Sequence, residues 1–351
     1  MKFGKTIKKT SPKASGVGLL TQNESCPRKA YAIHKGVPME HVAKLHGYDI
    51  EPAAANAVIK GNAFEKHLLE NQGSELRALL VQEGVLGAHE QRFVNIKTLV
   101  PNGTMQERAQ CTESFLHEKR NKKKSKNTIT GAVLSTIIGT EKWYFEADAL
   151  IAKDNEPFYR VFEFKMYPDR DYSSDHEKIA AARRQIAVYH LGLQQYLKQH
   201  STILPINFNA GLILTKPTTY KKPIFRETSI QEEFDQLSSS LCATQGIVGQ
   251  VEQYFSPNDS LDDPKVWSSI PYNYVPNKCS ICPMMKMCRK QAMTSKSPNL
   301  LSPALRQTQG LVRDTDELWA LTTQQQAPAT QEQLELQNHL HPLYQQYIQV
   351  R

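Results

Sequence analysis

The sequence predicts a mixed α/β fold, in which a mixed β-sheet forms the core and helices flank it. Two β-rich runs, at 143–152 and 158–166, are separated by the short polar turn 153–156 and predict a hairpin. An amphipathic pattern over 175–199 predicts a long helix behind this hairpin. The apolar run 207–215 then predicts a buried strand, so strands and helices alternate along this part of the chain.

The first part of the chain predicts mainly helices. Residues 1–20 are rich in Lys, Ser and Gly, and we expect a flexible basic tail there. Apolar residues at near-helical spacing predict one helix over about 26–45 and a second over about 51–72. The segment 77–135 mixes short apolar runs with basic residues, and we interpret it as an insertion with its own helix near 105–120.

The last part of the chain is less regular. A short strand at 222–227 and a helix at 230–254 are predicted to complete the core. A proline- and aspartate-rich linker follows at 256–276, and the Gln-rich extension 291–351 predicts helix or a disordered tail. We therefore expect one domain over 21–290, between the basic tail and the C-terminal extension.

The composition is that of a globular chain with a basic surface. Of its 351 residues, 40% are hydrophobic and 22% are charged, and the net charge of +8 suits a polyanionic partner. The basic cluster Lys119–Lys126 is either a solvated loop or a loop that contacts phosphates. No apolar run approaches the ~18 residues of a membrane span, and no secretory signal follows the basic N-terminus. We therefore expect a cytoplasmic protein with no membrane partner.

Two acids and a lysine meet at the predicted hairpin. Asp148 lies late in the first strand, and Glu163 and Lys165 share one face of the second, because residues two apart on a strand point the same way. Carboxylate oxygens suit hard divalent cations such as Mg²⁺ or Mn²⁺, which can polarise a phosphodiester and activate water. The alternative is an exposed Glu/Lys pair on an edge strand. The aromatic and Met residues between the charges favour a site, because they leave one polar side that presents both charges.

With these residues the chain resembles the PD-(D/E)xK nuclease superfamily and, within it, the RecB-like nucleases. The resemblance implies a restriction-endonuclease-like fold, with Asp148 and Glu163 as metal ligands and Lys165 as the catalytic lysine. The family's Q-x-x-x-Y motif matches Gln185 and Tyr189, an i,i+4 pair on one face of the predicted helix, which would hold the nucleic-acid strand.

One family motif is altered in this chain. Relatives carry a G-x-x-x-H helix whose His is a further metal ligand, whereas Glu65 occupies that position here and His67 follows two residues later. The two side chains lie about 200° apart on a helix, so both cannot face one site. We expect Glu65 to be the third ligand and keep His67 as the alternative. Beside the Q-x-x-x-Y motif, Arg183 and Arg184 are expected to contact the DNA backbone.

Four cysteines form a second pattern. Cys26 stands alone near the start, and Cys279, Cys282 and Cys288 form a C-x2-C-x5-C run about 250 residues later. Four thiolates could hold zinc or a [4Fe–4S] cluster, and unligated structural cysteines are the third possibility. Zinc sites commonly pair two short C-x2-C knuckles, which this spacing does not do.

The one-plus-three cysteine layout around the nuclease motifs resembles the iron–sulfur branch of RecB-like nucleases, which includes the AddB-type nuclease and the CRISPR-associated exonucleases. The resemblance implies a structural [4Fe–4S] cluster that joins the N- and C-terminal segments through the four cysteines.

Together these patterns and the resemblance predict a metal-dependent DNA nuclease, an exonuclease on single-stranded ends, and the resemblance associates such enzymes with DNA repair or antiviral defence. A helicase or another subunit of such a complex is a possible partner, since the chain has no helicase P-loop of its own. The alternatives are a DNA-end-binding or helicase-partner module with little cleavage, and an RNA-directed nuclease.

Overall fold

The fold is described from a computed structural model of the chain. The structure describes residues 14–22, 26–48, 55–121, 125–138, 141–168, 176–200, 207–216, 219–256, 259–274, 279, 282–296 and 311–349. Residues 1–13 of the basic tail expected over 1–20, and Lys122–Lys124 of the basic cluster, lie outside this part. Within it, no helix combines the length and apolar character needed to cross a membrane.

A six-stranded mixed sheet forms the centre, with the strands in sequence order from β1 to β6. The pairs β1–β2 and β4–β5 are parallel and the other neighbouring pairs are antiparallel. The strands are β1 (Phe93–Asn95), β2 (Thr128–Ile138), β3 (Glu141–Ile151), β4 (Arg160–Pro168), β5 (Asn209–Lys216) and β6 (Thr219–Ser229). The mixed sheet and the β3–β4 hairpin agree with the prediction from the sequence.

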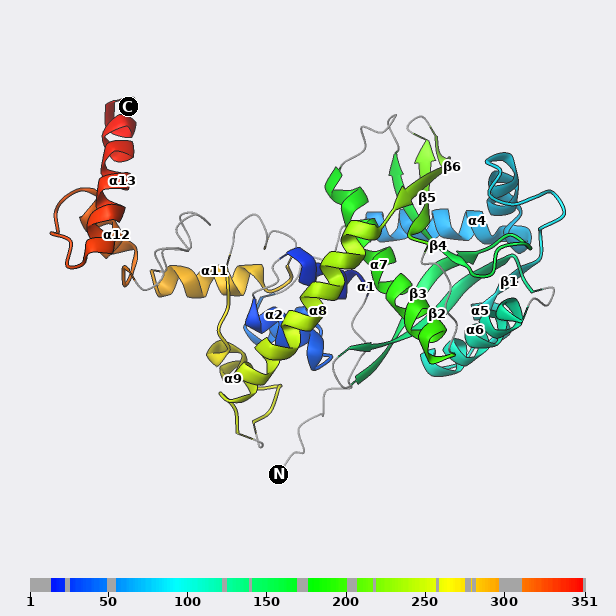
Figure 1. Cartoon of the computed structure of the whole chain (residues 1–351), viewed down its shortest axis with the longest axis horizontal. Helices are drawn as coiled ribbons and strands as arrows, with labels where there is room; N and C mark the ends of the chain where they lie inside the picture. The colour runs from blue at the N-terminus through cyan, green and yellow to red at the C-terminus, as the bar shows by residue number, and fades with distance from the viewer. Residues whose placement is uncertain are drawn as a thin grey trace. The chain divides into compact units, whose positions relative to one another are not determined.

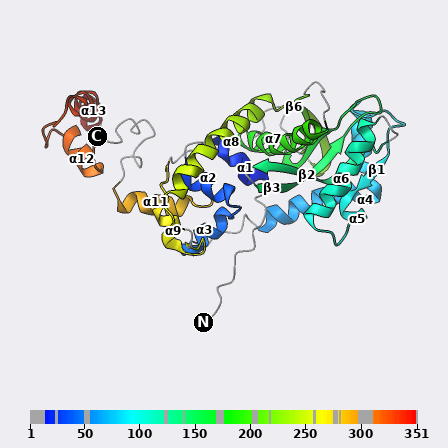
Figure 2. The ribbon, with the colours of Figure 1, turned by 60° about the horizontal axis from the view of Figure 1, so that its bottom comes forward.

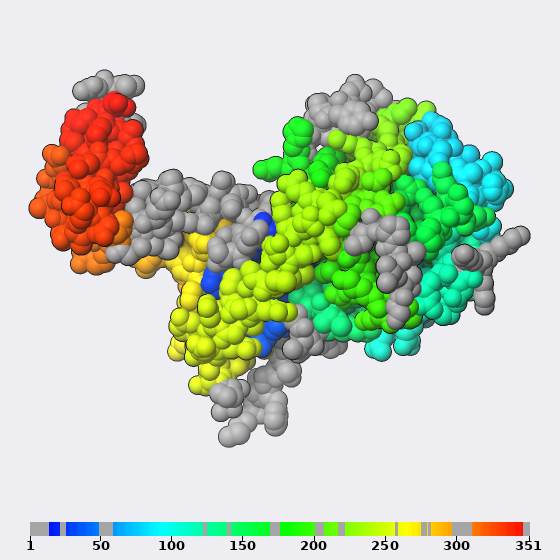
Figure 3. Space-filling model, in the orientation of Figure 1, coloured from blue at the N-terminus to red at the C-terminus, as the bar shows by residue number. Residues whose placement is uncertain are grey.

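Helices cover both faces of the sheet. The amphipathic helix α7 (His176–Gln199) connects the parallel strands β4 and β5 and packs on β2, β3 and β4. Figures 1 and 2 show α7 and α8 (Gln231–Glu252) on one face of the sheet and α4 (Ala55–Gln82) on the other. In Figure 3 the yellow-green surface of α8 lies beside the green surface of α7.

Helix α4 extends past the end expected at residue 72, but it is broken near that point. The backbone leaves helical geometry at Glu70–Gly73, where Asn71 and Gln72 have φ of 50° and 57°. Before the break, the apolar side chains of Phe64 and Leu68 pack into the core against strand residues such as Phe162 and Phe164. The break therefore separates the part of α4 that carries Glu65 from its second half.

The segment expected to be an insertion belongs to the sheet. Besides the predicted helix, now α6 (Met105–Arg120), it contains β1, α5 (Ile96–Leu99) and most of β2. Because β2 pairs with β3 along ten residues, from Thr128 to Ile138, it is a central strand. Strand β2 was not expected from the sequence, because the Thr- and Ile-rich run 128–138 is buried on both faces and no alternating pattern marks it as a strand.

The N-terminal segment also differs from the expectation. Residues 14–22, in part expected to be tail, form α1 (Ala14–Gly18) and a 3₁₀ turn (Leu19–Gln22), and Val17 and Leu20 are fully buried. Helix α1 packs on α7. The expected helix over 26–45 is divided into α2 (Pro27–His34) and α3 (Met39–Leu45).

The chain divides into two compact units, each of which is described by itself. The first unit consists of 1–24, 30–38 and 51–250, and the second of 25–29, 39–50 and 251–351. The second unit contains the remaining helices, which are α9 (Pro264–Ser269), α11 (Met285–Thr294), α12 (Thr315–Thr322) and α13 (Gln331–Gln349). These boundaries differ from the single domain expected over 21–290.

Candidate functional site

The predicted acids meet where β3 and β4 separate. The antiparallel ladder pairs Ala149 with Phe162, and the same register places Asp148 beside Glu163. Beyond this point the ladder ends, and the Phe164 N–H donates to the Asp148 carboxylate at 2.6 Å. The strand geometry therefore gathers both acids.

Lys165 forms an ion pair with Glu163, two residues earlier on β4. Its Nζ lies 2.6 Å from Glu163 Oε1, and the Glu163 side chain is only 1% exposed. The other oxygen, Glu163 Oε2, is buried and has no hydrogen-bond partner among the described residues. A buried carboxylate oxygen without a donor is costly unless a cation satisfies it. This unpaired oxygen fits a hard divalent ion, which is held through carboxylate oxygens.

Helix α7 brings the predicted Gln/Tyr pair to the lysine. Lys165 Nζ donates to Gln185 Oε1 at 3.2 Å, and Gln185 Nε2 donates to the Tyr189 hydroxyl at 2.7 Å. Tyr189 is 3% exposed, so it cannot itself hold a nucleic-acid strand as we expected. Its position behind Gln185 makes it a support for the amide that orients Lys165.

The site is rich in negative charge. Burial, and then the neighbouring Glu163 charge, raise the pKa of Asp148 well above its usual range. Burial likewise raises the pKa of Glu163, although Lys165 opposes this. Burial acts to lower the pKa of Lys165, but the Glu163 and Asp148 charges outweigh it and raise that pKa. A divalent cation would relieve the repulsion between the acids and favour their ionised forms.

Helix α4 places Glu65 toward this group and His67 elsewhere. The Glu65 charge contributes to the raised pKa values of both Asp148 and Glu163, so it lies within their electrostatic reach. His67 instead lines a hollow of about 500 Å³ with Lys60, Lys66 and other residues of α4, and with Met166 of β4. This arrangement favours Glu65 rather than His67 as the third metal ligand.

Two charged residues beside Glu65 were not predicted from the sequence. Lys97 Nζ lies 2.7 Å from Glu146 Oε1 and 3.5 Å from Glu65 Oε1. Glu146 precedes Asp148 by two residues on β3, so strand alternation could have placed it on the same face. Lys97 gave no such signal, because it lies in the segment that we interpreted as an insertion.

The two predicted DNA-contacting arginines are engaged within the protein. Arg183 forms an ion pair with Glu233 of α8 at 2.8 Å. Arg184 packs against Gly18 of α1, and burial lowers its pKa. In the basic cluster, Lys119 is buried, and its ammonium donates a hydrogen bond to the Lys153 carbonyl. Arg183 and Lys119 therefore each have a polar partner within the protein.

The four predicted cysteines all belong to the second unit. Cys26, Cys279 and Cys288 are buried and Cys282 is half-buried. Burial, with a smaller contribution from the Cys26 and Cys288 charges, raises the pKa of Cys282 to about 12. The thiols thus lie within electrostatic reach of one another. Among the described residues, no three of these cysteines have their sulfur atoms within 4.8 Å of one another, the spacing that would suit a single metal ion.

Arg28 is a third residue that was not predicted from the sequence. It is fully buried, and its guanidinium donates to Cys288 Sγ at 3.4 Å, Gln291 Oε1 at 2.6 Å and the Ile270 carbonyl at 2.8 Å. No carboxylate of the described residues pairs with it. Because a buried cation needs a negative partner, this environment fits thiolates that hold a cofactor.

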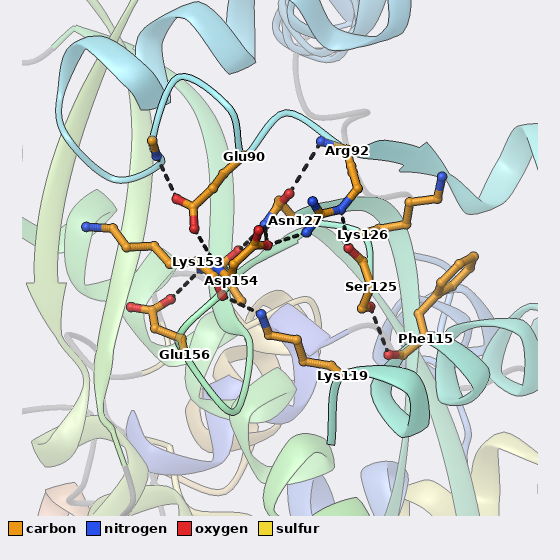
Figure 4. A network of polar contacts seen from close by, with 12 residues as sticks. Glu90, Arg92, Phe115, Lys119, Ser125, Lys126, Asn127, Lys153, Asp154 and Glu156 are labelled. Carbon is orange, nitrogen blue, oxygen red and sulfur yellow. Dashed lines mark hydrogen bonds and ion pairs between the residues drawn. The ribbon is translucent and has the colours of Figure 1, made fainter. Parts of the chain in front are cut away.

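A further group of potential ligands consists of His89, Glu90 and Asp154, whose ligand atoms lie within 4.8 Å of one another. Its carboxylates already have partners (Figure 4). Glu90 accepts from the backbone N–H groups of Gly87 and Asp154, and Asp154 accepts from Asn127. This network therefore fastens the β3–β4 turn to the segment before β1, and it needs no metal ion.

A scan against models of known protein families found no match to this chain, and a search of curated proteins found none either.

Proposed function

We propose that the chain is a metal-dependent DNA nuclease that hydrolyses phosphodiester bonds and acts on single-stranded ends. The observation that carries this proposal is the buried Oε2 of Glu163, which has no partner among the described residues and lies beside Asp148, with Lys165 on the other oxygen. Acids that bind a cation next to a fixed ammonium are the groups that phosphodiester hydrolysis requires.

Three carboxylates would hold the ion. Asp148, Glu163 and Glu65 converge from β3, β4 and α4 and carry a surplus of negative charge. Bound Mg²⁺ or Mn²⁺ would supply Lewis-acid polarisation of the phosphodiester and a water of lowered pKa.

Lys165 acts on the water and the phosphate. Its ammonium is held by Glu163 and by the Gln185 amide, so its direction is set before the substrate binds. A fixed ammonium orients the attacking water and stabilises the charge that develops on the phosphate oxygens. Gln185 and Tyr189 are positioning residues in this mechanism, because they act through Lys165.

The cysteine unit is proposed to carry a structural [4Fe–4S] cluster on Cys26, Cys279, Cys282 and Cys288. The support is the buried guanidinium of Arg28 beside Cys288, which no carboxylate in the described part of the chain pairs with. The net charge of +8 supports a nucleic-acid partner, and a helicase or another subunit of a repair or defence complex would supply the single-stranded ends.

The test is cleavage of end-labelled single- and double-stranded DNA and RNA by anaerobically purified protein, with Mg²⁺ or Mn²⁺ and with chelator. Lys165→Ala should lower the cleavage rate by about 100-fold or more, because it removes a preorganised charge from the transition state. Lys222→Ala is the matched control, since Lys222 is an exposed lysine of β6.

The outcomes separate the alternatives. Binding of DNA without cleavage by the wild type would favour an end-binding module over an enzyme. Cleavage of RNA alone would make the protein an RNA-directed nuclease. Equal cleavage by the wild type and Lys165→Ala would refute the proposed site.

A further inference from the structure

Beside the proposed metal ligands, the site holds a second cation that belongs to the protein itself. The Lys97 ammonium lies between Glu146 of β3 and Glu65 of α4, at 2.7 Å and 3.5 Å from their oxygens. Arg108 lies 3.7 Å from the other oxygen of Glu146. Two carboxylates from separate elements therefore share one ammonium.

The local backbone positions Lys97 between these two carboxylates. Lys97 lies in the first turn of α5, where Asn95 caps the helix by accepting from the Lys97 N–H at 2.9 Å. The Lys97 side chain then passes over Gly131, where an added Cβ would lie 3.2 Å from Lys97 Cγ. Gly131 has φ of +58°, a conformation that favours glycine. Figure 2 shows α5 near β1 and α4.

The strand register connects Lys97 with the acid site. Strand β2 pairs Thr130 with Ala149 and Ala132 with Ala147, so Gly131 lies opposite Asp148. Lys97 therefore crosses β2 next to the strand position that carries Asp148. The acids form two neighbouring pairs: Asp148 with Glu163, where Oε2 lacks a partner, and Glu65 with Glu146, where Lys97 is bound.

Nucleases that use two metal ions hold them about 3.5–4 Å apart with bridging carboxylates. Here Glu65 is shared between the proposed ion and the lysine. We propose that Lys97 takes the place of the second cation, so that the site binds one divalent ion. This inference rests on the proposed function, since it specifies the metal requirement of that site.

The test is the number of Mn²⁺ ions bound to anaerobically purified protein that has been dialysed free of Mg²⁺ and Mn²⁺, measured by electron paramagnetic resonance of the free ion. We expect one Mn²⁺ at this site in the wild type and two in Lys97→Met, because Glu65 and the Glu146 oxygen that faces Lys97 rather than Arg108 would then accept a cation. Lys97→Arg should retain a single ion, and Lys222→Met, an exposed lysine of β6, should behave as the wild type. If Lys97→Met does not fold, as judged by circular dichroism, Lys97→Gln replaces it.

Cleavage provides an independent second measurement. The dependence of the rate on Mn²⁺ concentration should have a Hill coefficient of about 1 in the wild type and about 2 in Lys97→Met. Two ions in the wild type, or one ion in both proteins, would overturn the inference while leaving the nuclease proposal intact. A wild type that binds one ion and cleaves nothing would refute the proposed function instead.

Discussion

Glu163 combines three constraints in one side chain. It is buried, one oxygen is ion-paired with Lys165, and the other has no described partner. An acid in this state is costly for folding, because burying a charge without full compensation destabilises a protein. Such a cost is expected at a functional site, where a ligand completes the coordination.

His190, the neighbour of Tyr189 on α7, allows a prediction about pH. Its ring lies 5.2 Å from that of Phe208 and 5.4 Å from that of Phe234, and its Nε2 has no described partner. Burial lowers the pKa of His190 from 6.5 to about 4. Well above pH 6.5 the ring is neutral in both the folded and the unfolded chain. As the pH falls toward 4 the unfolded chain binds the proton first, so this contribution to stability is progressively lost.

The loss should be on the order of 3 kcal/mol between pH 7 and pH 4. Denaturant unfolding at several pH values would measure it in the wild type and in His190→Leu, which should show a flatter dependence. His339→Leu, at an exposed position of α13, is the control. An unchanged pH dependence in His190→Leu would contradict the assignment.

At the scale of elements, the site depends on how closely β4 and β5 approach. The Phe162 ring of β4 covers Gly211 of β5, and an added Cβ on Gly211 would lie 2.1 Å from that ring. Because Phe162 pairs with Ala149 and is followed by Glu163, its position also sets the position of the acids. A small residue at 211 is therefore part of the support of the site.

Gly211→Val should destabilise the protein by about 1–3 kcal/mol or more, since the added side chain would displace Phe162. Gly246→Ala is a suitable control, because nothing lies within 4 Å of the added Cβ and the residue is in α8. That control should be neutral or stabilising by about 0.5–1 kcal/mol. Equal free energies of unfolding for the wild type and Gly211→Val would show that the sheet tolerates the added volume.

At the scale of the whole molecule, a few residues from the start of the chain belong to a unit formed mainly by its end. Cys26 and Arg28 are in the second unit, with residues 251–351. The Arg28 N–H donates to the Pro271 carbonyl, and its side chain contacts Cys288, 260 residues away. Closing so long a loop costs conformational entropy, which buried contacts must offset.

Arg28→Met should therefore lower the free energy of unfolding by at least about 2 kcal/mol, because the Ile270 carbonyl and the Gln291 amide would lose their donor. If the thiolates hold a cluster, the iron content should fall as well. Arg28→Lys should rescue little, because one ammonium cannot serve several divergent acceptors. Arg289→Met, at an exposed arginine beside Cys288, is the control. Wild-type stability and iron content in Arg28→Met would contradict this role.

The sequence by itself determined the mixed α/β class, the β3–β4 hairpin, the long helix α7, the shared face of Glu163 and Lys165, and the i,i+4 pair Gln185 and Tyr189. These features depend on local periodicity, which places residues two apart on a strand or four apart on a helix on one face. Tertiary structure alone decided that β2 is a central strand and that Lys97 reaches Glu65 and Glu146. It also decided that Arg28 lies against Cys288. Such contacts join residues far apart in the chain, and packing rather than local pattern selects them.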